Sequence, residues 1–344
     1  MRVTISDIAK ATGYSKTTVS FAFNNPRRIS KEARKKVLDA ARDLGYIPDP
    51  VARSLASGRH GTIGLLLPQP IPIAFQNPYM VHLVRGLGTI CNGEGLSLTM
   101  LPPKRGNLLN SVKGAAVDGL VTIGLRPEEE IVTVIRHRHI PFVSIDGPAD
   151  VGVPSVRIND REAARLAMAH LLDHGHCRIA VVVMDDTTEA DHEEYSEIGR
   201  ERLAGYRDAA RQHGLPWENV VEISAECSLA GGRETGRRVI EGHPDVTGVV
   251  AMSDILAIGI IQTLSDHGRS VPGEVSVVGF DDIPEASLLS PALTTVWQPA
   301  EEKGTRAAEL LVGMIRGADT PPDEVVELRC RLVPRATVSR VRCA

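Results

Sequence analysis

Aromatic residues are scarce in this sequence of 344 residues: only 3% are Phe, Trp or Tyr, whereas 42% are hydrophobic. A chain of this length and apolar content can bury two or more cores, which must be built mainly from Val, Leu, Ile and Ala. No apolar run approaches the ~20 residues that a membrane helix needs, and no secretory leader is visible. We therefore expect a soluble, cytoplasmic protein without a membrane partner.

Cysteines are also few, and they are widely separated in the sequence. No two of the five have the Cys-x-x-Cys spacing, so the pattern suggests neither a disulfide framework nor a structural zinc site. Reduced thiols are typical of a reducing compartment. We expect no metal site and no cofactor. The cysteines are Cys91, Cys177, Cys227, Cys330 and Cys343.

The motifs of several enzyme classes are missing as well. The sequence has no Gly-x-x-x-x-Gly-Lys-[Ser/Thr] loop, no Gly-x-Gly-x-x-Gly after its first predicted strand, no Gly-x-Ser-x-Gly and no His-Glu-x-x-His. We therefore predict that the protein is not an enzyme. A secreted solute-binding protein is the second alternative, and the lack of a visible leader and a basic N-terminal segment argue against it.

Charge is divided unevenly along the chain. Residues 1–60 carry 12 Lys or Arg against 5 Asp or Glu, whereas the whole chain carries 39 against 43. The N-terminal segment therefore has a net charge of +7, and the remainder has a net charge of −11. A small basic segment ahead of a larger acidic body indicates that this segment binds a polyanion.

The basic segment contains the signals of three helices. Ser6, Ser15 and Ser30 are candidate N-caps, and each helical stretch ends at Gly or Asn. Two short helices joined by a tight Gly-containing turn, with a longer third helix that supports them, form the helix-turn-helix pattern. We predict an all-α helix-turn-helix DNA-binding domain over residues 1–48.

Residues 49–60 form a linker with the signals of a helix but little apolar content. Asp49 is a candidate N-cap, Pro50 suits a first helical turn, and Gly58 suits a left-handed stop. These signals enclose about two turns, too few for a stable helix in water. We predict a hinge helix that forms only when something else supports it.

After Gly61, short Val/Ile/Leu runs alternate with amphipathic segments, a pattern typical of parallel sheets covered on both faces. The runs are too many for one ordinary sheet, so we predict an α/β body of two doubly wound parallel-sheet subdomains, with a ligand outside the carboxyl ends of the strands. The predicted strands are TIGLLLP, LSLTML, GLVTIG, PFVSID, RIAVVVM, VTGVVAMSD and VSVVGFDD. The body, 61–344, is divided into a first subdomain of about 61–158 plus 293–324 and a second of about 159–292 plus 325–344.

The runs VTISDIAKATGYSKTTVSFAFNN and VSVVGFDDIPEASLLSPALTTVWQP resemble the LacI/GalR family of bacterial transcriptional repressors, and the resemblance spans nearly the whole chain. It implies a homodimer that binds a pseudo-palindromic double-stranded operator. It also implies a body like a type I periplasmic binding protein, with a small-molecule effector between its subdomains. The hinge helix is implied to form on the operator, where a leucine, here Leu55, wedges a base step open in the minor groove.

The resemblance places the DNA contacts in the second helix and the hinge. Lys16 can donate to guanine, and Thr17 can bond a base edge or touch a thymine methyl. Phe21 stands where many members carry Arg or His, and it either packs on a thymine methyl or covers the helix pair. For Leu55, the alternative is a core residue. Ser15, Thr18 and Ser20 are expected to cap helices or donate to phosphate, and Arg28 could touch phosphate or be merely solvated. The predicted DNA-binding set also includes Thr4, Asn24, Ala52 and Arg53.

The predicted effector residues are those that match the family's cleft. Convergent carboxylates and a guanidinium suit a polyhydroxylated ligand, so we expect a sugar or related polyol, with a nucleobase or another small metabolite as the alternative. Arg202 and Asp281 could instead form a structural ion pair, and Trp297 could stack on a ligand or fill the crossover. The predicted effector-binding set is Tyr79, Met80, Asp146, Arg202, Ser253, Asp281 and Trp297.

The acidic run DDTTEADHEEYSE, residues 185–197, looks longer than its counterpart in the family. A solvated loop is the simpler interpretation, and a cationic effector or a metal held by Asp191, His192 and Glu193 is the alternative. The sequence does not indicate whether the effector releases the operator or promotes its binding, nor does it distinguish a dimer from a tetramer.

Overall fold

The computed structural model describes residues 3–49, 54, 58–124, 130–148, 152–184, 197–321 and 323–341. The chain divides into two compact units, Met1–Thr62 with Ala116–Asp118, and Ile63–Ala115 with Gly119–Ala344. The hinge residues Ala52, Arg53 and Leu55 lie outside the described residues, as does the acidic run up to residue 196. Within the described ranges, no helix is both long enough and apolar enough to cross a membrane.

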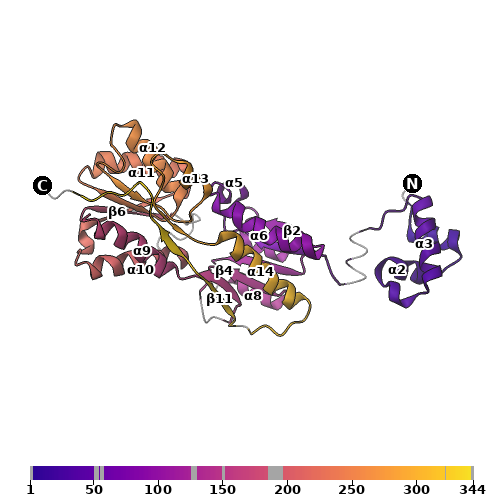
Figure 1. The fold of residues 1–344 in the computed structure, drawn as a ribbon. Helices are drawn as coiled ribbons and strands as arrows, with labels where there is room; N and C mark the ends of the chain where they lie inside the picture. The colour runs from indigo at the N-terminus through magenta and orange to yellow at the C-terminus, as the bar shows by residue number, and fades with distance from the viewer. Residues whose placement is uncertain are drawn as a thin grey trace. The chain divides into compact units, whose positions relative to one another are not determined.

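The N-terminal unit contains a helix-turn-helix head, as predicted (Figure 1). Gly13, with a φ of 75°, turns the chain between its first two helices, in the left-handed conformation that glycine adopts without strain. Five buried side chains from the three α-helices form its core: Ile8, Val19, Ala22, Val37 and Ala41. The described elements are α1 (Ile5–Thr12), α2 (Lys16–Asn24), the 3-10 turn η1 (Pro26–Arg28) and α3 (Lys31–Asp43).

Two of the three predicted N-caps of the head are confirmed. Ser15 and Ser30 each accept a hydrogen bond from the backbone N–H three residues further on, at 3.1 Å. The prediction of Ser6 as a cap is wrong, because α1 begins after Thr4. The Asp7 carboxylate reaches back to the Thr4 backbone nitrogen at 2.9 Å and to its hydroxyl at 2.7 Å, and this reciprocal capping fixes the helix start one position before Ser6.

The first sheet of the body has the strand order β11-β5-β4-β3-β1-β2. Its registered pairs, β1–β3, β3–β4, β4–β5 and β5–β11, are all parallel. The strands are β1 (Thr62–Leu66), β2 (Ser97–Leu101), β3 (Gly119–Ile123), β4 (Phe142–Ile145), β5 (Ser155–Ile158) and β11 (Val325–Leu328). The helices of this subdomain are α5 (Ile71–Ala74), α6 (Tyr79–Glu94), α7 (Leu108–Lys113), α8 (Glu130–His137) and α14 (Ala300–Ile315).

Two predicted subdomain boundaries are wrong. Residues 293–324 are assigned to the first subdomain, but Leu293 and Val296 lie in the cores of the second. Residues 325–344 were assigned to the second subdomain, but Val325–Leu328 pairs with β5 at the edge of the first sheet. The chain returns to the second subdomain only afterwards, through β12 (Arg331–Val333). The sequence did not indicate this pairing, because β11 has only four residues and Glu327 interrupts its apolar run.

Helices α6 and α14 pack closely on one face of the first sheet, over a core that includes Leu83, Leu87 and Leu311. Glycines make this approach possible. A Cβ atom at Gly86 would lie 2.0 Å from a backbone oxygen of α14, and one at Gly304 would lie 2.2 Å from a backbone oxygen of α6. The close contact fixes the start of α14, which carries part of the site described below.

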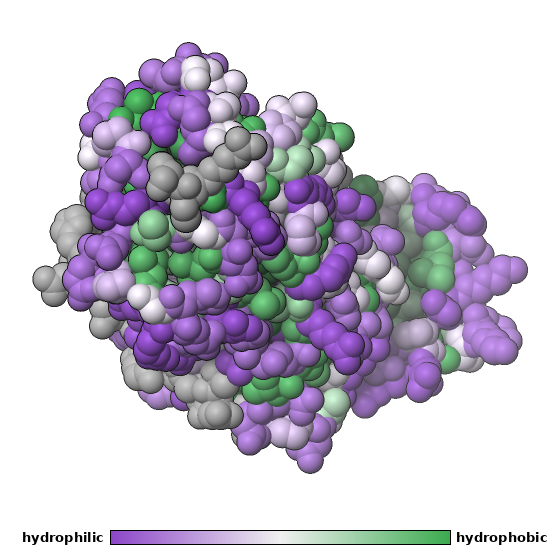
Figure 2. Space-filling view, turned by 60° about the vertical axis from the view of Figure 1, so that its left-hand side comes forward, coloured by the Kyte–Doolittle hydropathy of each residue, from purple (hydrophilic) through white to green (hydrophobic). Residues whose placement is uncertain are grey.

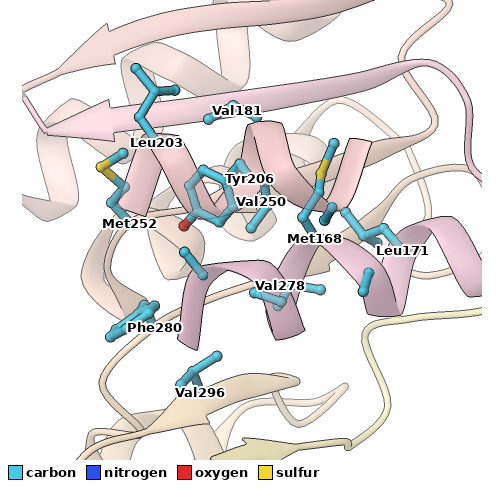
Figure 3. Close-up of a cluster of buried hydrophobic side chains, with 14 of the residues drawn as sticks. Met168, Leu171, Val181, Leu203, Tyr206, Val250, Met252, Val278, Phe280 and Val296 are labelled. Carbon is cyan, nitrogen blue, oxygen red and sulfur yellow. The ribbon is translucent and has the colours of Figure 1, made fainter. Parts of the chain in front are cut away.

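The second sheet has the order β7-β6-β8-β9 and is parallel throughout. Figure 1 shows α9 and α10 on one side of β6, with α11 and α12 on the other. Tyr206 of α10 lies among Met168, Val181 and Phe280 in the core beneath α9 and α10 (Figure 3). The elements are β6 (Ile179–Met184), β7 (Val220–Ala225), β8 (Gly248–Ala251), β9 (Ser276–Val278), α9 (Asp160–Asp173), α10 (Glu197–Gln212), η2 (Trp217–Asn219), α11 (Leu229–Gly242), α12 (Asp254–Asp266) and α13 (Pro284–Leu288).

The two subdomains are joined by several crossings of the chain. It passes from β5 to α9, from β10 (Thr295–Trp297) to α14, and from β11 to β12, with β10 and β12 paired antiparallel. Both sheets have the doubly wound order in which the second strand lies outside the first. The predicted fold class is confirmed, and such folds bind ligands at the carboxyl ends of their strands.

Candidate functional site

Apart from Thr4, which caps α1, the predicted DNA-contacting residues that the structure describes lie on α2, at its N-cap or on the η1 turn that follows it. Lys16 and Thr17 are exposed at the start of α2, and Asn24 at its end donates to the Ser20 hydroxyl at 3.2 Å. The Ser15 hydroxyl, besides capping α2, bonds the Thr18 hydroxyl at 2.9 Å. The head therefore presents the first turn of α2 to solvent, as a helix that enters a major groove must do.

Phe21 does not belong to the hydrophobic core of the head. Its ring is half-buried, yet the cluster around Ile8 and Val19 includes Phe23 and not Phe21 among the described residues. The Arg28 guanidinium lies over the Phe21 ring instead, 5.5 Å from its centre. This distance falls within the range of a cation–π contact.

Two of the predicted effector carboxylates lie at strand ends in strained backbone. Asp146 follows β4 with a φ of 54°, and Asp281 follows β9 with a φ of 115°. Each residue in such a conformation costs about 1–3 kcal/mol and is commonly found at functional sites. Both residues are buried, each with 6% of its surface exposed.

Lys303, on α14, is the main residue of this site that the sequence analysis missed. Its side chain is fully buried, and Nζ donates to both oxygens of Asp146, at 2.6 and 2.8 Å, and to the Gln298 side-chain oxygen at 2.6 Å. These contacts use all three N–H donors of an ammonium group. The Tyr79 hydroxyl donates to Asp146 as well, at 3.3 Å, so Asp146 is held by groups of its own subdomain.

Gln298 and Asn77, also missed, connect this cluster to Asp281. The Gln298 amide donates to one oxygen of Asp281 at 2.5 Å, and the Asn77 amide donates to the other at 3.4 Å. Asn77 precedes α6 in the first subdomain, and Asp281 follows β9 in the second. Asp281 therefore accepts hydrogen bonds from both the first subdomain and the crossover.

Arg202 does form a structural ion pair, but with Asp160 rather than with Asp281. Its Nε donates to Asp160 at 2.8 Å and Nη1 donates to the Met252 carbonyl at 2.5 Å. The guanidinium carbon lies 3.6 Å from the centre of the Phe280 ring. Among the described residues, none accepts a hydrogen bond from Nη2, which leaves this nitrogen available to a ligand.

Burial dominates the electrostatics of the cleft. Burial raises the pKa of Asp146, although the nearby Lys303 lowers it. Burial also raises the pKa of Asp281 to about 6, although the charge of Arg202 lowers it. Burial and the neighbouring Asp281 raise the pKa of Asp254 well above its usual value. Burial and the Asp146 carboxylate likewise raise the pKa of the Tyr79 hydroxyl.

A pocket of about 490 Å³ opens beside Asp281, a volume within the range of small-molecule sites. Of the predicted effector residues, it gathers Tyr79, Asp281 and Trp297, and Gln298 also lines it, whereas Asp146, Arg202, Ser253 and Met80 do not. A ligand in this pocket would meet the Trp297 side chain, and the Arg331 guanidinium lies 4.3 Å from the centre of the Trp297 ring.

Ser253 and Met80 have other roles in the structure. The Ser253 hydroxyl caps α12 and accepts a hydrogen bond from the Cys227 thiol at 3.3 Å. Met80 packs against the core of the first subdomain. In the described part of the chain, no group of three or more His, Cys, Asp or Glu side chains could hold a metal ion.

The sequence contains a pattern that could have identified Lys303 as a residue of the site. On α14 it lies three residues after Ala300 and four before Ala307, both of which are buried, so it occupies the apolar face of an amphipathic helix. A lysine at such a position needs a buried acidic partner. Gln298 and Asn77 carry no comparable signal, since polar residues in loops are common.

A helix-turn-helix head joined to two doubly wound subdomains with a polar cleft defines a ligand-responsive DNA-binding protein. Residues 4–49 match the description "Bacterial regulatory proteins, lacI family", and residues 168–338 match "Periplasmic binding protein-like domain". The chain belongs to the LacI family of transcriptional regulators, and its relatives are named as regulators rather than enzymes.

Three similar proteins illustrate this membership. An HTH-type transcriptional regulator of Mycobacterium tuberculosis is 35% identical over 327 residues, covering 90% of each chain. The HTH-type transcriptional repressor PurR of Aliivibrio fischeri is 30% identical and covers 98% of each chain. The structure of the transcriptional regulator CelR in complex with cellobiose is 27% identical, with a TM-score of 0.71, and the match covers 98% of this chain and all of that one.

Proposed function

We propose that this protein is a repressor that binds a pseudo-palindromic operator as a homodimer and responds to an uncharged sugar or related polyol. The observation that carries the effector class is the set of partners around Asp281. Asp146 and Asp160 are each paired with a buried cation, Lys303 and Arg202, whereas Asp281 is bonded at its side chain by two neutral amides. Ligand hydroxyls can replace amides there without leaving a buried cation unpaired.

Two further features support a hydroxyl-rich ligand. No described residue accepts a hydrogen bond from Nη2 of Arg202. Trp297 lines the pocket beside Asp281, where an aromatic ring can pack against the apolar face of a sugar. CelR, whose structure was solved with cellobiose, is a precedent for a sugar in this fold. Because its target is DNA, the protein would act in the cytoplasm.

Asp281 also supports a mechanism for the response. Gln298 and Asn77 connect Asp281 to the crossover and to the first subdomain. A ligand that takes over Asp281 removes these two bonds and adds its own, so it stabilises a different arrangement of the two subdomains. In a dimer this change would alter the spacing of the paired hinges, and with it the affinity for the operator.

Exposed apolar side chains on the body support association of two copies. Figure 2 shows hydrophobic residues gathered in patches between hydrophilic ones on the face that it presents. The large exposed hydrophobic residues of the body, among those described, are Ile71, Ile73 and Val81 on α5 and α6, and Leu288 on α13. We assign these residues to a contact with a second copy, which the two-fold symmetry of the operator requires.

The hinge gives a first prediction. Leu55→Ala is expected to weaken binding to the operator strongly while affinity for unrelated duplexes falls little, because an apolar wedge acts only where a base step is opened. Fluorescence anisotropy with both duplexes measures the two affinities. Equal losses on both would show that Leu55 serves stability rather than the bending of DNA.

The raised pKa of Asp281 gives a second prediction. The ionised carboxylate accepts hydroxyl hydrogens, so the affinity for a polyol should be constant above pH 7 and fall about tenfold per pH unit below the pKa of about 6. Calorimetric titrations between pH 5 and 8 measure this dependence. Asp281→Asn should bind weakly and show no such step, whereas Glu285→Gln, at an exposed position on α13, should behave as the wild type does.

The proposal as a whole is tested in three assays on the full chain. Selection from random duplexes should return one pseudo-palindromic sequence, and sedimentation should show a dimer. In a thermal-shift screen of sugars, polyols and nucleobases, a polyol should raise the melting temperature of the protein. Selection of no sequence would refute the DNA-binding assignment, and a response to a nucleobase alone would refute the polyol.

A further inference from the structure

The face of α2 that carries Thr17 also carries Phe21. The two residues are four positions apart, so their side chains lie one above the other on the helix surface. Thr17 is exposed at the first turn, where the proposed repressor reads its operator. Phe21 is therefore in position to approach the bases next to those that Thr17 meets.

Phe21 cannot itself form a hydrogen bond to a base, and its ring is not used by the core of the head. Arg28 carries the hydrogen-bond donors that Phe21 lacks. It is exposed on η1 and its guanidinium lies over the Phe21 ring. No described residue forms an ion pair or a hydrogen bond with its side chain, so all five of its N–H donors are available.

A guanidinium that lies over an aromatic ring keeps the edges of its plane free. Those edges present two parallel N–H groups, the geometry that matches O6 and N7 of guanine. The contact with the ring also restricts the arginine to one region over α2, which reduces the entropy lost when it binds. A freely moving surface arginine would contact phosphate without this restriction.

We propose that Phe21 and Arg28 act as one reading unit, in which the Phe21 ring holds the Arg28 guanidinium against a guanine in each half of the operator. Arg28 is then a specificity-determining residue and Phe21 is a positioning residue. The inference rests on the proposed function and assigns a base contact to a residue that would otherwise only neutralise phosphate. It also accounts for a phenylalanine on the reading face of α2.

The test compares sequence preferences of full-length variants in selections from random duplexes at one salt concentration. The wild type should select a G·C pair at one position of each half-site. Arg28→Ala and Phe21→Ala should both reduce the preference at that position, about tenfold or more for Arg28→Ala, and leave the other positions unchanged. Arg28→Lys should restore affinity but not the full preference, because ammonium lacks the bidentate geometry.

Arg27→Ala is the matched control, because Arg27 is exposed on the same turn and no described residue pairs with it. It should lower the affinity for all sequences equally. If Arg28→Ala does the same, Arg28 contacts phosphate and the inference is wrong. If Phe21→Leu keeps the full preference, the aromatic ring is not needed and the reading unit is refuted. Failure of the wild type to select any sequence would instead refute the proposed function.

Discussion

Replacing Lys303 with methionine is expected to lower the free energy of unfolding of the body by about 3–5 kcal/mol. The substitution keeps most of the volume of the side chain but removes the only cation within hydrogen-bonding distance of Asp146 among the described residues. A buried carboxylate without its partner costs more than the pair itself contributes, because the charge has already been removed from water. Urea denaturation followed by circular dichroism measures the change.

A double-mutant cycle separates the charge effect from packing. Adding Asp146→Asn to Lys303→Met removes the unpaired charge, and the Asn side-chain oxygen can still accept the hydrogen bond from Tyr79. The double variant should therefore recover most of the stability that the single variant loses. Equal losses in both variants would mean that the unpaired charge of Asp146 does not cause the loss, and the buried pair would then not organise the cleft.

The second large effect expected is the salt dependence of DNA binding. Residues 1–60 carry a net charge of +7, and a dimer presents two such heads to one duplex. A protein that makes about 6–10 phosphate contacts loses about 10³–10⁵-fold in affinity between 50 and 200 mM salt. Anisotropy titrations with the selected duplex over this range should show a loss of that size.

The same titrations with variants show where the dependence comes from. Arg27→Ala should reduce the slope of log affinity against log salt by about 0.9 for each phosphate contact it removes. Arg165→Ala, on the surface of the second subdomain, should leave the slope unchanged. A slope near zero in the wild type would contradict a basic head that binds the phosphate backbone.

The fold was predictable where local patterns are strong. The buried central strands, such as β6 and β8, are continuous apolar runs because helices cover both faces. Edge and crossover strands gave no such pattern: in β7, Glu222 and Ser224 point to solvent, and β10 and β12 have three residues each. Their pairing depends on contacts between distant segments, which periodicity does not record.

The site was predictable at the strand ends and unpredictable in its partners. The resemblance to the family indicated Asp146 and Asp281, and the topology agrees, since ligands in such folds meet the residues that follow the strands. The ion pairs of Asp146 with Lys303 and of Asp160 with Arg202 join residues 157 and 42 positions apart. Rules based on local spacing in the sequence do not relate residues so far apart. The sequence therefore could not indicate which carboxylate has no cationic partner and can bind a ligand.

The central claim is that cleft occupancy and operator affinity are coupled in one protein. The most direct test measures the affinity of the full chain for the selected duplex with and without a saturating polyol, and the affinity for that polyol with and without the duplex. Thermodynamic linkage predicts the same factor in both directions, about 5–150-fold. A polyol that binds the cleft and leaves the affinity for the duplex unchanged would contradict the account.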